Sequence, residues 1–292
     1  MSYPLSAYRT PSFWRHALFS SEPLARVLAA VGGLYLFVEA LDFFGIFTRD
    51  EHSAWTPVAM VLVSVVYVVI TRRPVSRVKY KIPKKDFSYE VVIGDLFESD
   101  ADIVISSNTT FDTDIASGRI SPNSLQGQLA ERVFNCKTDE IDRHINNALR
   151  GKPSEEAVSP GKKRRYPIGT VVKLTANNRN YYLLAMAELN QHGNAYSDPE
   201  MIDAALRGLW DYVAQNGELR DIAIPLVGTG RGRLGLPRKK IVERIAQSFA
   251  DASRDRVFAN KLIIVVRPQD AENFDVNLFE IRDYLTRSLH VA

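Results

Sequence analysis

The sequence predicts an α/β domain, with a mixed or parallel sheet flanked by helices, preceded by two membrane-spanning helices. Three observations lead to this prediction. From about residue 86 onward, short apolar runs alternate with amphipathic stretches, which is typical of strands that alternate with helices. Two long apolar runs come first, in residues 24–47 and 53–71. The segment between these runs and the α/β pattern, residues 72–85, holds seven Lys and Arg and no Asp or Glu.

The overall composition is that of an ordinary globular protein. Of the 292 residues, 46% are hydrophobic and 24% are charged, which argues against a disordered, collagen-like or coiled-coil chain. The single cysteine, Cys136, excludes an internal disulfide and a zinc site made of several cysteines. The sequence has no HExxH motif and no paired metal-ligand spacing. We therefore expect neither a metal site nor a cofactor.

The two apolar runs have lengths that suit a bilayer. As helices, residues 24–47 would be roughly 36 Å long and residues 53–71 about 28 Å, against a hydrocarbon core of about 30 Å. The alternatives are buried core helices or, for the valine-rich part 58–70, strands of a soluble protein. A signal peptide fits less well, because a second apolar run follows the first instead of a small-residue cleavage site.

The positions of Lys and Arg predict the orientation of these spans. The segment that connects them, residues 48–54, has only Arg49, whereas seven basic residues follow the second span. The positive-inside rule therefore places both termini in the cytoplasm. We expect four regions: an N-terminal cytoplasmic flank (1–23), a transmembrane hairpin (24–71), a basic juxtamembrane linker (72–85) and a cytoplasmic ligand-binding domain (86–292).

Two acidic residues lie in the first span. Glu39 and Asp42 are three apart, so they share one face of a helix. They would line the interface between subunits of an oligomer or a pore, or they would lie near the end of the span at the outer surface of the bilayer.

The elements of the α/β domain follow from the apolar pattern. Six strands are predicted, at 87–93, 102–107, 168–174, 180–187, 221–226 and 260–266. Five helices are predicted, at 122–134, 138–150, 198–216, 237–253 and 270–288. Pro237 and the pair Asp198-Pro199 are typical helix starts. The segment 151–165 reads as a loop, and its basic run KKRR is expected to be solvated, with binding of acidic groups as the alternative.

A glycine-rich segment, VGTGRGRLG, follows the predicted strand 221–226 and leads into a helix. Ligands of α/β sheets bind at the carboxyl ends of strands. Glycine lets a backbone approach phosphate closely, and successive N–H groups supply positive potential. The letters match GxGxxG, but the triplet is set back from the strand end, which argues against a dinucleotide fingerprint. The alternative is a tight turn. The predicted phosphate loop consists of Val227, Gly228, Thr229, Gly230, Arg231, Gly232, Arg233, Leu234 and Gly235.

Two further segments hold candidate binding residues. Asp95 directly follows a strand and Gly94, so its carboxylate can accept hydrogen bonds from an exocyclic amine or a ribose hydroxyl; the alternative is a turn residue or helix cap. In SPNSLQGQ, Gly127 lies inside a helical pattern at a cost of about 1 kcal/mol relative to Ala. It indicates close packing against a ligand or a neighbouring backbone, or else a frayed helix start. The candidates from these segments are Asp95, Leu96, Asn108, Ser124, Leu125, Gln126 and Gly127.

In this order, the three segments resemble the macrodomain family over roughly residues 86–268. The resemblance implies a three-layer α/β/α fold with a mixed sheet. It also implies that Asp95 of Gly94-Asp95-Leu96 contacts the adenine of ADP-ribose, that Asn108 leads into the first ligand loop, and that 227–235 surround the diphosphate. Hydrolytic macrodomains carry a GGGVDGAI-like loop after the Asn, with a catalytic acid or histidine. The corresponding segment here, TTFDTDIASGRISPNSLQGQL, has no Gly triplet and no matching acid, so we expect no catalytic residue.

The SLQGQ variant and the two N-terminal spans are similar to the transmembrane-macrodomain effectors of type II Thoeris anti-phage defence in bacteria. This resemblance implies that a partner TIR-domain enzyme makes a signal from NAD, an ADP-ribose conjugated to histidine. It implies further that the macrodomain binds the signal, and that the membrane segment then disrupts the lipid bilayer of the inner membrane.

We therefore expect a non-enzymatic, homo-oligomeric membrane effector. The alternative is a membrane-tethered ADP-ribosyl hydrolase, which the missing loop acid disfavours. A third possibility, an adaptor that binds nucleic acid, is disfavoured because aromatic residues are not interleaved with the basic runs.

Overall fold

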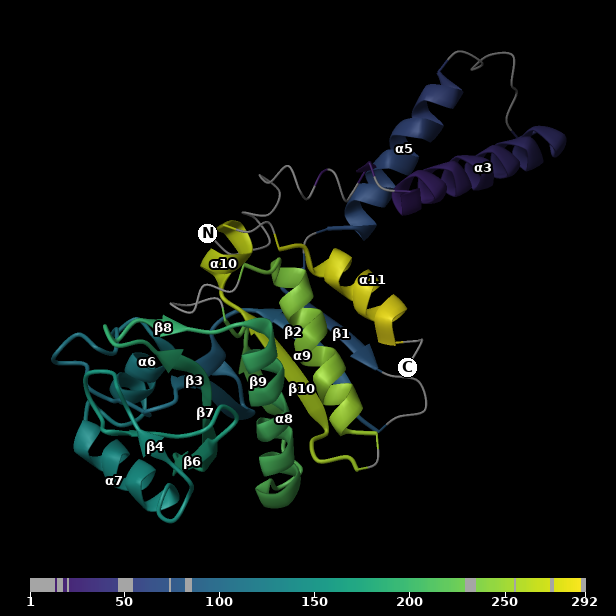
Figure 1. Ribbon diagram of the computed structural model, residues 1–292. Helices are drawn as coiled ribbons and strands as arrows, with labels where there is room; N and C mark the ends of the chain where they lie inside the picture. Colours follow the sequence, from purple (N-terminus) through teal and green to yellow (C-terminus); the bar gives the residue numbers. More distant parts are fainter. Residues whose placement is uncertain are drawn as a thin grey trace. The chain divides into compact units, whose positions relative to one another are not determined.

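The computed structural model consists of two compact units, which are described separately (Figure 1). One comprises Arg77–Pro268 with Ile281–Ala292, and the other comprises Met1–Ser76 with Gln269–Glu280. The structure describes residues 14, 18–19, 21–46, 55–73, 75–81, 86–228, 235–254, 256–273 and 276–289.

The larger unit is built on a mixed sheet. Within the described residues, eight strands form it, and seven of them run in the order β1-β2-β10-β9-β3-β7-β6, with β8 paired to β7. The five central strands are parallel to one another, and β1, β6 and β8 pair antiparallel with their neighbours. The strands are β1 (Arg77–Lys81), β2 (Ser88–Ile93), β3 (Asp102–Asn108), β6 (Val171–Ala176), β7 (Arg179–Leu189), β8 (Ala195–Tyr196), β9 (Ile222–Pro225) and β10 (Lys261–Val266).

Helices cover both faces of this sheet, which makes three layers (Figure 1). The helices within this unit are η1 (Leu96–Glu98), α6 (Leu125–Arg132), α7 (Thr138–Ala148), α8 (Pro199–Asn216) and α9 (Arg238–Ala252). Two more helices follow along the chain, α10 (Pro268–Asn273) and α11 (Leu278–Leu289), and residues 269–280 of this stretch belong to the smaller unit. On one face, Ile103 and Ile105 of β3 share a buried core with Leu129 of α6 and Ile145 of α7. Successive residues of a strand point to opposite faces of the sheet. The strand residues that alternate with this core therefore face α8 and α9.

An aromatic cluster fixes α8 and α9 to the second face. The Tyr89 hydroxyl of β2 donates a hydrogen bond to the carbonyl oxygen of Ala246 in α9 at 2.9 Å. The Phe249 ring of α9 lies 5.7 Å from Tyr89 and 5.3 Å from Trp210 of α8, both edge to face. These rings are almost completely buried, so they contribute both apolar area and favourable ring geometry.

The predicted strands and most predicted helices are confirmed, with shifts of a few residues at their ends. The Asp198 carboxylate caps α8 by accepting a hydrogen bond from the Met201 N–H at 2.8 Å, as the Asp-Pro pair predicted. The helix predicted at 270–288 is two helices, α10 and α11. The Asn277 side chain accepts a hydrogen bond from the Glu280 N–H at 3.4 Å at the start of α11, which is typical of a new helix start.

Four short strands were not predicted. The segment 151–165, predicted as a loop, contains the two-stranded pair β4 (Glu155–Glu156) and β5 (Arg164–Arg165). Strand β8 lies between β7 and α8. Strand β1 falls within residues 72–85, the predicted basic linker. Its Lys and Arg alternate with half-buried Val78 and Tyr80. This alternation is typical of a strand, and exposed basic residues are common on strands at the edge of a sheet.

The smaller unit contains two apolar helices, α3 (Ser21–Phe43) and α5 (Thr56–Thr71). Residues 23–43 form the one helix in the described part of the chain that is long and apolar enough to cross a membrane, with a mean hydropathy of 1.8 and none of its most apolar window buried. Helix α5 is also apolar, but its 16 residues make it shorter than a helix that would cross a membrane by this measure. The alternative of strands in 58–70 is therefore wrong.

A close contact between α8 and the turn before β6 provides a test of the packing. A Cβ added at Gly208 would lie 2.8 Å from the Cα of Gly169, and it would also meet that residue's carbonyl oxygen. Gly208→Ala gains about 1 kcal/mol of helix propensity, but overpacking costs about 1–3 kcal/mol. We expect a net loss of stability and a melting temperature lower by about 2–6 °C, measured by circular dichroism on the full chain in detergent.

The control is Gln215→Ala, an exposed position on the same helix, which gains propensity without a clash. Equal or higher melting temperatures for both variants would show that α8 does not approach the turn this closely.

Candidate ligand-binding site

The parallel strands bring the candidate residues to one edge of the sheet. Asp95 comes two residues after β2, Asn108 is the last residue of β3, and Val227 and Gly228 follow β9. Strand β10 pairs with both β2 and β9, and the Gly94 N–H continues this pairing by donating to the Val266 carbonyl oxygen at 3.0 Å. Strand β9 also pairs in parallel with the start of β3. The carboxyl ends of these strands therefore lie at one edge of the sheet, where ligands of α/β sheets bind.

Asp95 is both a helix cap and an ion-pair partner. Its Oδ1 accepts a hydrogen bond from the Phe97 N–H at 2.9 Å and caps η1, which confirms the helix-cap alternative. Its Oδ2 lies 2.6 Å from Nη1 of Arg132 at the end of α6, and the Asp95 side chain remains 36% exposed. Because two carboxylate oxygens offer about four acceptor positions, these contacts leave room for a further donor.

Leu96 follows Asp95 but lies in the core. Its side chain is 3% exposed and packs with the buried cluster that includes Ile103. Only its backbone is therefore placed to meet a ligand.

Asn108 organises the loop that follows β3. Its Oδ1 accepts hydrogen bonds from the Thr110 N–H at 3.2 Å, the Thr110 hydroxyl at 3.0 Å and the Asp112 N–H at 3.2 Å. The loop passes through a left-handed residue, Phe111, at φ 51°, which is rare for a bulky side chain. The Phe111 ring is fully buried, and this burial offsets the strain of the backbone.

A polar network attaches this loop to α7. The Lys162 ammonium donates to the Phe111 carbonyl oxygen and to Asp142 Oδ1, both at 2.6 Å, and the Thr113 hydroxyl donates to the same carboxylate at 2.7 Å. Lys162 belongs to the KKRR run that we expected to be solvated. The run instead supplies a link between the loop and α7, and nothing in its sequence distinguishes the residue that does so.

Two acidic residues lie in the same loop. Asp112 is 3% exposed, and its Oδ2 has no hydrogen-bond partner among the described residues. The pKa of Asp114 is lowered, chiefly by the hydrogen bond from the Ser117 N–H and further by Arg119. A carboxylate with a lowered pKa is a weak base. The contacts of Asp114 with Ser117 and Arg119 stabilise the loop.

The start of α6 is bound to the same loop. The Ser124 hydroxyl caps the helix by accepting from the Gly127 N–H at 3.1 Å. Gln126 donates from Nε2 to the Ser107 hydroxyl at 2.9 Å and to the Asp112 carbonyl oxygen at 3.2 Å.

Gly127 is buried against the preceding turn. An added Cβ would lie 2.6 Å from the Pro122 carbonyl oxygen and would also meet that of Ser121. Of the explanations for this glycine, close packing against a neighbouring backbone is therefore the one the structure shows. Leu125 packs partly buried against the core.

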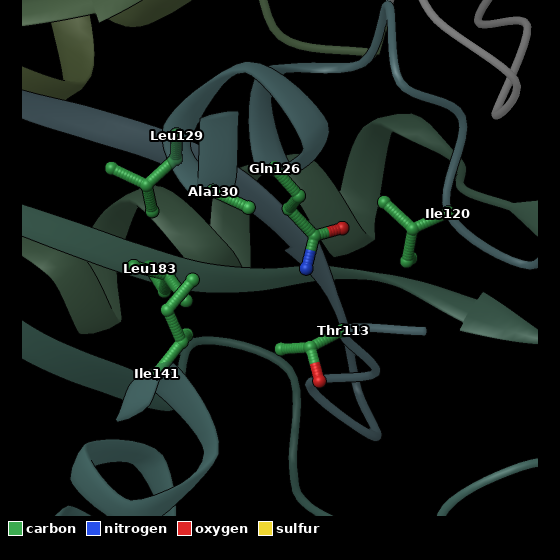
Figure 2. A pocket seen from close by; sticks show the side chains of 7 residues that line it. All are labelled: Thr113, Ile120, Gln126, Leu129, Ala130, Ile141 and Leu183. Carbon is green, nitrogen blue, oxygen red and sulfur yellow. The ribbon is translucent and has the colours of Figure 1, made fainter. Parts of the chain in front are cut away.

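A small cavity lies beneath this loop. Figure 2 shows the Gln126 amide among the side chains that line this cavity, which are otherwise apolar except for Thr113, whose hydroxyl points away from Gln126. Its volume is about 10 Å³, roughly the space of one water molecule. It is lined by Thr113, Ile120, Gln126, Leu129, Ala130, Ile141 and Leu183.

The predicted phosphate loop is described only at its two ends. Val227 is 1% exposed, and Gly228 has φ +71°, a conformation that favours glycine. An added Cβ at Gly235 would meet nothing within 4 Å. Thr229, Gly230, Arg231, Gly232, Arg233 and Leu234 lie outside the described residues.

Sequence reasoning missed Arg132 and Phe97. Arg132 lies at the end of a predicted helix, where a basic residue is common because it complements the helix dipole, so its position carried no functional signal. Among the described residues, no group of three or more His, Cys, Asp or Glu could hold a metal ion.

Comparisons with known proteins identify the family and the fold. The family described as Thoeris protein ThsA, Macro domain, matches residues 89–267. A variant of the Oceanobacillus iheyensis macrodomain is 17% identical, with a TM-score of 0.51 over 73% of this chain and 100% of that one. A Trypanosoma brucei macrodomain solved in complex with ADP-ribose is 13% identical, with a TM-score of 0.42 over 65% of this chain and 69% of that one. No curated protein matches the sequence.

The family match spans more than half of the chain and runs from the second residue of β2 to just beyond the end of β10. The mixed sheet between two helical layers agrees with it. The chain therefore belongs to the family of Thoeris ThsA macrodomains.

Proposed function

We propose that this chain is a membrane-anchored effector of anti-phage defence. Its macrodomain binds an ADP-ribose-derived signal, histidine-ADP-ribose made by a partner TIR enzyme, and the bound state triggers disruption of the inner membrane. The observation that carries the proposal is the placement of Asp95, the Asn108 loop and the Val227-Gly228 turn at one edge of the sheet, in a chain that matches the ThsA macrodomain family.

The chemistry of this edge suits the parts of ADP-ribose. The Asp95 carboxylate has acceptor capacity for the exocyclic amine of adenine. The loop that begins at Val227 supplies glycine N–H groups for a diphosphate, with Arg231 and Arg233 adding charge. The Asn108 loop, which α6 and α7 hold by hydrogen bonds, would lie against the distal ribose.

We infer that ligand binding, and not hydrolysis, is the function of the site. The loop after Asn108 has no acid in the pattern of hydrolytic macrodomains. Asp114 is a weak base with a lowered pKa. One observation favours the alternative of a tethered ADP-ribosyl hydrolase, namely the buried Asp112 carboxylate with one oxygen free of hydrogen bonds among the described residues.

The membrane part of the proposal rests on α3 and α5. We propose that they form the transmembrane hairpin, with both termini in the cytoplasm and residues 48–54 outside. A ligand shifts an assembly only through a difference in affinity between two states. A tenfold shift of the assembly requires about 1.4 kcal/mol in total, and in a homo-oligomer several sites add their contributions to it.

The first prediction concerns binding. Calorimetry on the full chain in detergent will show binding of ADP-ribose and stronger binding of histidine-ADP-ribose, and Asp95→Ala will lower the affinity at least about tenfold by removing the acceptor. Affinity is the readout because this variant also loses a cap worth about 1 kcal/mol. Asp100→Ala, an exposed acid nearby, is the control. If the full chain binds neither ADP-ribose nor histidine-ADP-ribose in these titrations, the proposal is contradicted.

The second prediction concerns turnover. Incubated with ADP-ribosylated protein or with histidine-ADP-ribose, the chain will release no free ADP-ribose beyond the buffer control. Release with turnover that Asp112→Asn abolishes would establish the hydrolase instead.

The third prediction concerns topology. Cys136 is exposed and is the chain's one cysteine, so a membrane-impermeant thiol reagent will label it only after lysis of spheroplasts. In a Cys136→Ser background, Ser53→Cys will be labelled in intact spheroplasts. Labelling of Cys136 from outside would reverse the orientation.

A further inference from the structure

Arg132 lies between the acid and the aromatic ring of the proposed adenine region. It is the last residue of α6, and its Nη1 is 2.6 Å from Asp95 Oδ2. Its guanidinium carbon lies over the Phe97 ring, 4.8 Å from the centroid. Asp95 and Phe97 are themselves joined by the hydrogen bond that caps η1. The three side chains therefore form one cluster at the carboxyl edge of the sheet.

This cluster holds the guanidinium by two contacts at a partly open surface. The Arg132 side chain is 38% exposed. The guanidinium therefore has the Phe97 ring on one side, and the side chain as a whole remains partly open to solvent. Stability alone does not account for the arrangement, because an exposed ion pair contributes about 0–1 kcal/mol.

The charge balance indicates which part of a nucleotide fits here. The Asp95 carboxylate neutralises the guanidinium at contact distance, so a phosphate would gain little attraction from Arg132. A flat, uncharged base loses nothing by this neutralisation. Bases stack on arginine guanidinium planes as they do on aromatic rings.

We propose that Arg132 is a further ligand-binding residue, whose guanidinium stacks on the purine base while Asp95 accepts a hydrogen bond from the base's exocyclic amine. The assignment rests on the proposed function, because it describes how the same site recognises adenine. Asp95 can bind Arg132 and the amine of the base at the same time. Its two oxygens accept one hydrogen bond each, from the Phe97 N–H and from Arg132, and they retain further acceptor positions.

The test replaces the planar guanidinium of Arg132 with side chains that lack a plane, one without charge and one with it. Calorimetry on the full chain in detergent measures the affinity for ADP-ribose and for its inosine analogue, in which a carbonyl replaces the amine. Arg132→Met will lower both affinities about tenfold, because stacking serves either base. Arg132→Lys will lower them similarly, because an ammonium keeps the charge but has no plane. Arg143→Met, an exposed arginine of α7, removes the same charge and will bind as the wild type does.

Each outcome separates the two proposals. If the wild type binds ADP-ribose and Arg132→Met binds equally well, the assignment of Arg132 is wrong and the proposed function stands. If Arg132→Lys retains wild-type affinity, Arg132 acts by charge and the stacking assignment is overturned. If the wild type binds neither ligand, both proposals fail. Melting temperatures of all variants, which should agree within a few degrees, identify any loss that comes from unfolding.

Discussion

Parallel pairing of the central strands is the constraint on which the rest of the molecule depends. Because β2, β10, β9, β3 and β7 run in the same direction, residues from distant parts of the sequence leave the sheet at the same edge. Each strand is buried on both faces, so a slip of one residue would exchange the two cores. The core contacts of Ile103 and Tyr89 on opposite faces therefore also fix the positions of the candidate binding residues.

Several residues of the edge serve the fold and the proposed site at once. Asp95 caps η1 and binds Arg132, and Asn108 holds its own loop through three hydrogen bonds. Such double use makes a loop rigid before a ligand arrives, which lowers the entropic cost of binding. The buried Phe111 in a left-handed conformation shows where this rigidity carries strain.

The sequence predicted the strands of the central sheet because buried strands leave short apolar runs, and it predicted α8 from the Asp198 cap. It missed β1, because the charges of Arg77 and Lys79 mask a period of two. It selected Asp95 from its place after a strand, but Arg132 carried no signal, since its partner is 37 residues away in the chain. For Gly127 it left two explanations open, which only the position of the Pro122 backbone separates.

The central claim is that this macrodomain receives an ADP-ribose-derived signal. The most direct measurement is mass spectrometry of small molecules that copurify with the full chain from phage-infected cells that carry the partner enzyme. The account predicts an ADP-ribose derivative with the mass of the histidine conjugate, absent from uninfected cells and lost in Asp95→Ala. A bound molecule without an adenosine diphosphate group, or no bound molecule in infected cells, would contradict it.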